Sequence, residues 1–127
     1  MLVVTKDAEI LEADGEFYGR KWVRIMCDFA ADGVWNIAGE SICADSLPVD
    51  DALLDRIGRW QLNYDERADE ADSPTPSFDL QAHDAEGLAI AHAVKAQLPE
   101  WTVIFFEEAK ARSATARRSN FEYEIFL

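Results

Sequence analysis

Hydrophobic and polar residues alternate near the start of the chain, which predicts β-strands. In WVRIMCDF (22–29) an apolar residue stands at every second position, which gives a strand one core face. The positions expected on that face are Val23, Ile25, Cys27 and Phe29. Asp32-Gly33 then predicts a turn, and VWNI (34–37) predicts a second strand antiparallel to the first.

A helical pattern follows GESICADS (39–46), which we expect to be a loop. Leu47-Pro48-Val49-Asp50 predicts a helix start, because proline disfavours helical geometry in the preceding residue and Asp50 can cap the first free amides. Apolar residues then recur at steps of four, three and four, as one stripe facing the core: Leu53, Ile57, Trp60 and Tyr64. The prolines of SPTPS (73–77) must break the chain.

The second half predicts one more helix and two more strands. The helix runs from about 81 to 98, Pro99 stops it, and its buried side is Leu88, Ala91, Val94 and Leu98. WTVIFF (101–106) is apolar on both alternating sets, which favours a strand in mid-sheet or covered on both faces. FEYEIFL (121–127) alternates, which predicts a strand with one wet face.

The order β-β-α-α-β-β predicts an α+β domain in which two helices pack on a mostly antiparallel sheet. We expect residues 1–127 to form a single domain, because this length buries one core. The first twenty residues give only weak strand and turn signals. Residues 107–120 are expected to form a basic loop or hairpin tip.

Charge narrows the classes of partner. The chain has 12 basic and 25 acidic residues, a net charge of −13, which repels nucleic-acid phosphates and anionic lipid. A basic protein would be attracted; the alternative interpretation is that the acidic residues only keep the chain soluble. The start MLVVTKDAEI has no basic region, and no apolar run approaches a membrane span of about 20 residues. We therefore expect a cytoplasmic protein with no membrane or nucleic-acid partner.

The acid is most concentrated in residues 65–86, which hold eight carboxylates against Arg67 alone. Like charges at helical spacing, at the negative end of a helix dipole, predict a helix that frays soon after Tyr64. The lack of a DxDxDG loop excludes an EF-hand, so at most weak calcium or magnesium binding is expected. The cluster is either a solvated edge or a docking site for a basic partner, formed by Asp65, Glu66, Asp69, Glu70 and Asp72.

No set of residues suggests catalysis or a cofactor. His83 and His92 are nine residues apart and so lie on opposite sides of one helix, where they cannot share a metal. A polar role at the helix start suffices for His83. We expect Cys27 to be buried and inert, and Cys43, beside acidic residues, to be a weak nucleophile. The two cysteines predict no disulfide or zinc site, and no glycine-rich phosphate loop is present.

The alternative is an enzyme or a small-molecule binder with a pocket between sheet and helices. Its side chains would be Asp28, Trp35 and Arg56, together with Arg112, Arg117 and Arg118 of the basic loop. Guanidinium groups of that loop can hold a phosphate or a carboxylate, or the loop can simply be solvated.

Residues 28–65 resemble a group of small bacterial proteins of unassigned activity. Their pattern is D-[FY]-x-x-x-x-x-W, a glycine, then L-P-[LV]-S-x-x-L-x-x-R-[LI]-x-x-W-x-x-x-[YF]-D. The matching residues are Asp28, Phe29, Trp35, Gly39, Leu47, Pro48, Leu53, Arg56, Ile57, Trp60, Tyr64 and Asp65. Asp50 stands where serine is usual, an exchange of one N-cap for another. The resemblance covers about 22–106 and implies a fold outline but no mechanism. Its polar members suggest a buried brace of Arg56 with Asp65 or Asp28.

Three hypotheses follow. The first is a non-enzymatic binding protein, of the immunity or antitoxin type, whose acidic surface meets a basic partner. The second is the small-molecule binder or enzyme with the pocket described above. The third is a module that associates with itself, as a homodimer.

Overall fold

A computed structural model describes residues 15–69, 78–112 and 121–127. The elements are β1 (Trp22–Ile25), β2 (Val34–Trp35), a 3-10 turn η1 (Ala44–Ser46), α2 (Asp51–Arg67), α3 (Leu80–Gln97), β3 (Thr102–Phe106), the short α4 (Glu108–Ala111) and β4 (Glu122–Ile125). The predicted order β-β-α-α-β-β is confirmed, with η1 and α4 as additions. No helix in the described part of the chain is long and apolar enough to cross a membrane.

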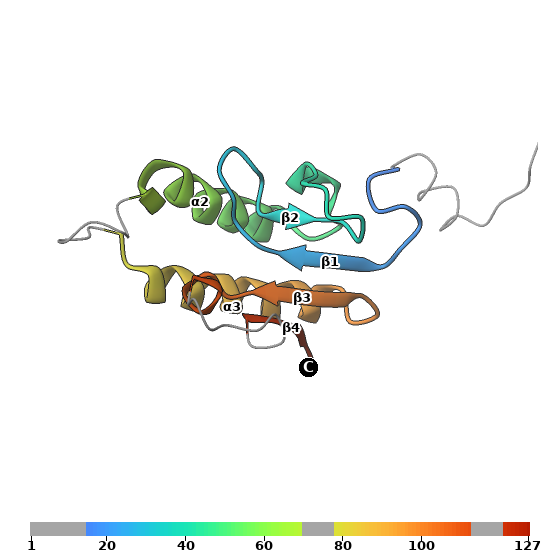
Figure 1. Ribbon diagram of the computed structural model, residues 1–127. Coiled ribbons are helices and arrows are strands. Elements are labelled where there is room, and N and C mark those ends of the chain that lie inside the picture. Colours follow the sequence, from blue (N-terminus) through green and yellow to red (C-terminus); the bar gives the residue numbers. More distant parts are fainter. Residues whose placement is uncertain (1–14, 70–77, 113–120) are drawn as a thin grey trace, which may run out of the picture.

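The four strands form one mixed sheet in the order β2-β1-β3-β4. The pairs β1–β2 and β3–β4 are antiparallel, whereas β1 and β3 run parallel, with Val23 opposite Val103 (Figure 1). Parallel neighbours need a long crossover connection, and the two long helices supply it. The predicted α+β fold with a mostly antiparallel sheet is confirmed, and β3 lies in mid-sheet as its sequence predicts.

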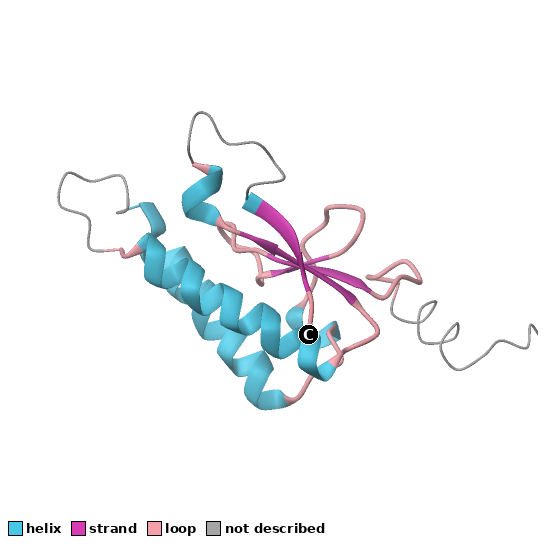
Figure 2. Ribbon diagram, turned by 90° about the horizontal axis from the view of Figure 1, so that it is seen from below, coloured by secondary structure: helices cyan, strands magenta, loops and turns pink. Residues whose placement is uncertain are grey.

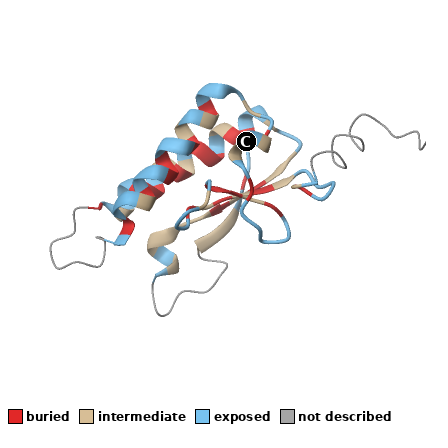
Figure 3. Cartoon of the chain, turned by 90° about the horizontal axis from the view of Figure 1, so that it is seen from above, coloured by how far each residue is buried: buried red, intermediate tan, exposed pale blue. Residues whose placement is uncertain are grey.

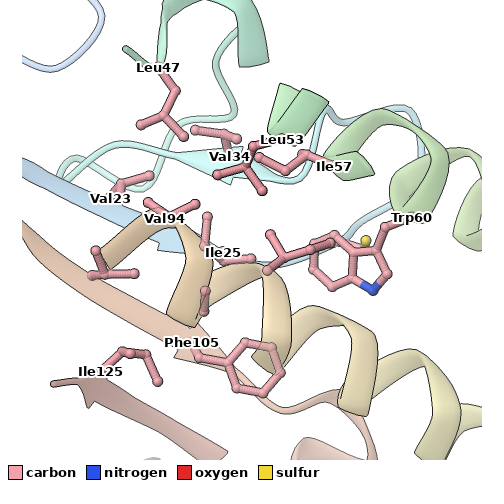
Figure 4. Packing of buried hydrophobic residues seen from close by; sticks show 14 of the residues in the cluster. Val23, Ile25, Val34, Leu47, Leu53, Ile57, Trp60, Val94, Phe105 and Ile125 are labelled. Carbon is pink, nitrogen blue, oxygen red and sulfur yellow. The ribbon is translucent and has the colours of Figure 1, made fainter. Parts of the chain in front are cut away.

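Both long helices lie on the same side of the sheet (Figure 2). Their buried residues gather where they face it, and their outer sides are exposed (Figure 3). The stripe predicted for α2 is confirmed, since Leu53, Ile57, Trp60 and Tyr64 are all buried. Figure 4 shows Ile57 and Trp60 of α2, Val94 of α3, and Ile25 and Phe105 of the sheet as members of one buried cluster.

The buried side of α3 is only partly the predicted one. Ala91 and Val94 are buried, but Leu88 and Leu98 are half-buried. The helix is turned so that His83, Asp84, Gly87 and Ile90 also face the interior. Gly87 accounts for this turn, because it lets the Trp60 ring approach: a Cβ at this position would lie 2.5 Å from Trp60 Cζ2.

The predicted start of α2 is confirmed, and its predicted end is wrong. Asp50 is the N-cap, and its carboxylate accepts a hydrogen bond from the Leu53 amide at 2.9 Å. At the other end the helix continues through Arg67 instead of fraying soon after Tyr64. Asp65 is held there by hydrogen bonds from the Ala30 amide (2.8 Å) and Gln61 Nε2 (3.0 Å), and Ala68 is fully buried.

The first strand is shorter than its alternating pattern. It ends at Ile25, and a turn at 28–31 takes the chain toward β2, with Ala30 at φ 63°. Cys27 is still buried, as predicted, but Phe29 is 53% exposed, so its predicted place on the core face is wrong. The turn carries Phe29 outward because it breaks the two-residue period. The second strand likewise stops at Trp35, since the buried Asn36 bonds the loop amides of Ala38 and Glu40.

Candidate functional site

Helix α2 separates its charges onto two flanks. At 3.6 residues per turn, most of the acids lie toward one edge of its exposed face and the arginines toward the other, while Asp55, Arg59 and Glu66 lie together on the outermost part. The acidic flank comprises Asp51, Asp55, Asp65 and Glu66, with Asp69 just beyond the helix. The arginine flank comprises Arg56, Arg59 and Arg67. A partner approaching from the acidic side therefore meets carboxylates that the arginines do not screen at contact distance, except Asp55, which pairs with Arg59.

A hollow of about 290 Å³ lies on the acidic flank. We call it the acidic hollow, because carboxylates from three separate segments line it: Asp32 before β2, Asp45 in η1, and Asp65 in α2. Asp32 Oδ2 accepts a hydrogen bond from the Ala44 amide at 3.0 Å. Within the described ranges none of these three carboxylates forms an ion pair. The hollow is thus an anionic concavity built by tertiary packing.

Exposed apolar side chains adjoin these carboxylates. Leu62 lines the acidic hollow and is 54% exposed. Phe29 is similarly exposed, and its ring centroid lies 5.0 Å from that of Tyr64 at the end of α2. Carboxylates beside exposed apolar groups suit a protein partner with cationic and apolar side chains.

A second concavity, the arginine groove, runs between α2 and α3 with a volume of about 410 Å³. Arg56 Nε and Nη2 each donate to the Glu86 carboxylate at 2.8 Å. These hydrogen bonds lower the pKa of Glu86 and raise that of Arg56. Arg59 Nε lies 3.1 Å from Asp55 Oδ2, and Arg67 also lines the groove. Arg56 and Arg59 are therefore paired with carboxylates of this chain.

His83 lies under this groove and is not the polar helix-start residue that the sequence predicts. Its ring is buried and stacks on Trp60, with centroids 5.0 Å apart and planes 15° apart. Burial, and then the charge of Arg112, lower its pKa to about 4. His83 is therefore neutral near pH 7. His92 is exposed on the other side of the helix, as the spacing predicts.

Asp84 is buried, although its place in the acidic segment 65–86 predicts a position at the surface. Its two carboxylate oxygens accept hydrogen bonds from the amides of Glu108 (3.0 Å) and Ala109 (2.9 Å), which fixes the start of α4. Burial raises its pKa to about 6, against the effect of these two bonds. The sequence does not predict this burial, because Asp84 and its neighbour His83 are both polar residues near the start of a helix.

Among the described residues, the groups that could act on another molecule thus lie at the surface. Within the described residues, no three histidine, cysteine, aspartate or glutamate side chains are grouped so that they could hold a metal. Burial also raises the pKa of the Cys27 thiol, which keeps it protonated. What the described residues offer is a surface of unpaired carboxylates for another molecule to contact.

A family model described as Serratia CdiI immunity protein-like matches residues 21–108. The chain belongs to the Serratia CdiI immunity protein-like family. This is a family of contact-dependent inhibition immunity proteins, which bind a toxin partner. The match spans more than half of the chain, from β1 to the start of α4, and includes the segment of the bacterial resemblance. A search of curated proteins gave no match.

In this member of the family, the predicted acidic surface divides into separate parts. Asp65, Glu66 and Asp69 lie on or just past the acidic flank, whereas Glu70 and Asp72 lie outside the described residues. Of the later acids, Asp79 caps α3, Asp84 is buried, and Glu86 pairs with Arg56. Sequence reasoning missed Asp32 and Asp45, which only the fold brings to the same surface.

The predicted brace of Arg56 with Asp65 or Asp28 is absent. Arg56 bonds Glu86 instead, and Asp65 bonds Ala30 and Gln61. The spacing already contains the reason: Arg56 and Asp65 are nine residues apart on one helix, on opposite sides. Among the described residues, the one hydrogen-bond donor to the Asp28 carboxylate is the amide of its own neighbour Phe29, at 2.8 Å.

The residues of the predicted pocket do not line one cavity. Arg56 lines the arginine groove, which includes none of Asp28, Trp35 and Arg112. Trp35 Nε1 donates to the Met26 carbonyl at 2.7 Å, within the β1–β2 hairpin. Arg112 Nε donates to Glu108 at 3.2 Å and lines a different hollow, next to Phe29 and Asp69. Arg117 and Arg118 lie outside the described residues.

Proposed function

We propose that this protein is an immunity protein that neutralises a basic toxin domain by binding it, and that the acidic flank of α2 is part of the contact. The contact residues of this proposal are Asp65, Glu66, Asp69, Glu70 and Asp72. The observation that carries it is a group of carboxylates at the end of α2, Asp65, Glu66 and Asp69, that form no ion pair within the described residues and lie beside exposed Phe29 and Leu62. Family membership supplies the class of partner.

Neutralisation in this proposal needs binding alone. A net charge of −13 raises the rate of encounter with a cationic surface, and complementary charges fix the orientation of the two proteins. The apolar groups at the same place exclude water from the contact. The bound immunity protein then blocks access to the toxin's substrate site or holds the toxin away from its target.

The test uses the cognate toxin domain, the partner that family membership implies. Co-expression with the wild-type protein should restore growth, and the purified pair should bind more weakly as salt is raised. Glu66→Gln combined with Asp69→Asn should weaken binding by about tenfold or more at low salt. A toxin domain with an acidic surface, or growth that this protein does not restore, would contradict the proposal.

A matched variant controls for net charge. Glu100→Gln combined with Glu124→Gln removes two negative charges from exposed positions on other elements. This pair should change the affinity by less than about threefold, because it lies outside the proposed contact and acts only through the long-range field. Equal losses from the two double variants would mean that the acid acts through net charge and not through a surface.

The arginine groove favours a second candidate, binding of a small anion. Arg67 and Asn63 line the groove together with Arg56 and Arg59, and guanidinium groups bind carboxylates and phosphates through paired hydrogen bonds. Thermal shift with inorganic phosphate, citrate and nucleotides tests this function. A rise in Tm that Arg59→Gln removes would support it, and the absence of any shift would exclude these ligands.

A further inference from the structure

We infer that Phe29 is the side chain of this protein that enters an apolar pocket of the toxin, and that Asp65 is the positioning residue that holds Phe29 in place for this contact. The inference rests on the proposed function and deepens it, because it names the apolar centre of the contact and the chemistry of the surface that meets it. The matching pocket on the toxin has apolar walls and a rim of lysine or arginine side chains.

Phe29 is exposed although its position in the sequence predicts burial. The two-residue period of β1 puts residue 29 on the core side of the sheet, yet 53% of Phe29 is exposed. Its ring centroid lies 5.0 Å from that of the buried Tyr64, so the ring rests on α2 while more than half of the residue stays accessible. An aromatic ring supported in this way offers a large apolar area and loses little side-chain freedom on binding.

A turn of the backbone produces this exposure. The Ala31 amide donates to the Asp28 carbonyl at 3.1 Å, which closes a turn over 28–31, and Ala30 has φ 63°. This left-handed conformation is unfavourable for alanine, and a residue keeps it only where the surrounding structure holds it. The loop that joins β1 and β2 lies beside α2, and α2 supplies the groups that hold the turn (Figure 1).

Two side chains of α2 fix the turn. Asp65 Oδ1 accepts a hydrogen bond from the Ala30 amide at 2.8 Å. Gln61, which is 4% exposed, donates from Nε2 to the Asp28 carbonyl at 2.8 Å and to the same Asp65 oxygen at 3.0 Å. The residues on both sides of Phe29 are therefore bonded to a helix. Because the turn is already ordered in the free protein, binding costs little further backbone entropy.

The surroundings of Phe29 define the chemistry of the matching pocket. Phe29 lines a hollow of about 500 Å³ together with Ala68, Asp69, Glu108 and Arg112. Arg112 Nε lies 3.2 Å from Glu108 Oε1, so this cation is paired within the chain. Asp69 forms no ion pair within the described residues. An apolar ring beside such a carboxylate is complementary to an apolar pocket with a basic rim.

A second copy of this chain fits the surface around Phe29 less well than the toxin does. It would bring its own carboxylates and a net charge of −13 to the same place, and like charges oppose the contact.

Phe29→Ala tests the apolar contact, with isothermal titration calorimetry against the purified cognate toxin domain. We expect binding to weaken at least tenfold. Because the lost contact is apolar, this loss should be the same at low and high salt, whereas the loss from Glu66→Gln with Asp69→Asn should shrink as salt is raised. A Phe29→Ala loss that disappeared at high salt would contradict an apolar contact.

Phe126→Ala is the matched control for the loss of an exposed ring. Phe126 is 68% exposed and follows Ile125, which lies opposite Val103 and so near the start of β1, whereas Phe29 follows the end of β1. Phe126→Ala should bind within about twofold of wild type. An equal loss from both phenylalanine variants would overturn the assignment of the contact to Phe29.

Two substitutions at position 65 separate positioning from charge. Asp65→Asn removes the charge but keeps an oxygen that can accept the Ala30 amide, so it should bind within about threefold of wild type. Asp65→Ala removes the acceptor and should weaken binding at least tenfold. Added to Phe29→Ala, it should cost no more than about threefold further, because the turn then has no ring to position. Equal losses from Asp65→Asn and Asp65→Ala would show that Asp65 acts through its charge and would overturn its positioning role.

The outcomes separate the two proposals. If the wild-type protein does not bind the toxin domain, the proposed function fails. If it binds, and Glu66→Gln with Asp69→Asn weakens the complex while Phe29→Ala binds like wild type, only the inference about Phe29 is wrong. The inference is also wrong if Phe29→Ala turns a dimer into a monomer in sedimentation at unchanged toxin affinity, because a second copy then covers Phe29. Far-ultraviolet circular dichroism and urea unfolding confirm that each variant is folded before its affinity is compared.

Discussion

His83 and Asp84 are adjacent residues whose pKa values are shifted so that they act on stability in opposite directions. Burial lowers the pKa of His83 to about 4 and raises that of Asp84 to about 6. As pH falls from 7, the unfolded chain protonates its histidine first, so the His83 contribution to stability is lost between about pH 6.5 and 4. Asp84 takes up its proton first in the folded state, so its contribution rises between about pH 6 and 4.

This opposition predicts a pH effect of one substitution. Asp84→Asn removes the contribution that rises on acidification and leaves that of His83, so the variant should lose more stability than wild type between pH 7 and pH 4.5. Urea unfolding at several pH values measures the difference, to which the other carboxylates contribute equally in both proteins. Glu124→Gln controls for the loss of one exposed charge. Parallel curves for Asp84→Asn and wild type would contradict the assignment.

Single residues were predicted best where local chemistry decides their role. Asp50 was predicted as the cap of α2 from its own carboxylate and the nearby proline. The burial of Cys27 was predicted from the two-residue period of the strand. His83 and Asp84 were not predicted to be buried. Their environment is supplied by Trp60, Tyr64 and α4, which are distant in the sequence.

At the level of elements, one pair of residues, Trp60 and Gly87, limits how closely α2 and α3 approach each other. Trp60 Nε1 donates to the His83 carbonyl at 3.0 Å, and the same ring covers Gly87. A Cβ at position 87 would lie 2.5 Å from Trp60 and 2.8 Å from Phe105, whereas a Cβ at Gly58 meets nothing within 4 Å. The space around these two helix glycines therefore differs: position 58 has room for a side chain, whereas position 87 has none unless the two rings move.

We expect alanine at these two positions to change stability in opposite directions. Gly58→Ala should stabilise the protein by about 0.5–1 kcal/mol, because alanine loses less backbone entropy in a helix. Gly87→Ala gains the same helix propensity but forces two large rings apart, so it should destabilise by about 1–3 kcal/mol. Urea or thermal unfolding of both variants tests the pair. A Gly87→Ala protein as stable as Gly58→Ala would show that the helices can separate without cost.

The elements were predictable in kind and order but less so at their ends. The helical stripe of α2 depends on its own spacing, so it was predicted correctly. The length of β1 depends on where β2 and the turn at 28–31 allow pairing, so the alternation through Phe29 was misleading. The extension of α2 through Arg67 depends on the hydrogen bonds that Asp65 forms with other segments and on the burial of Ala68.

For the whole molecule, the sign of the net charge can be predicted from the sequence, but only part of the distribution of that charge can. Asp65, Glu66 and Asp69 could be predicted as a cluster because they are neighbours along one helix. Asp65 lines the same hollow as Asp32 and Asp45 only when β2, η1 and α2 pack together. The acidic surface of the folded molecule is therefore centred nearer to the acidic hollow than the sequence predicts.

This distribution predicts that two kinds of variant will affect different rate constants. Exposed charges such as Glu66 and Asp69 act at a distance, so Glu66→Gln with Asp69→Asn should mainly lower the association rate and flatten its salt dependence. Asp45→Asn removes a carboxylate that lines the acidic hollow, where a toxin group in direct contact is less screened by solvent, so it should mainly raise the dissociation rate. Stopped-flow association and competition-based dissociation, each at several salt concentrations, separate the two. Screening weakens the exposed charges beyond about 8 Å at physiological salt, so the difference should be largest at low salt. If both variants changed the association rate alone, the acidic hollow would act only as part of the overall field.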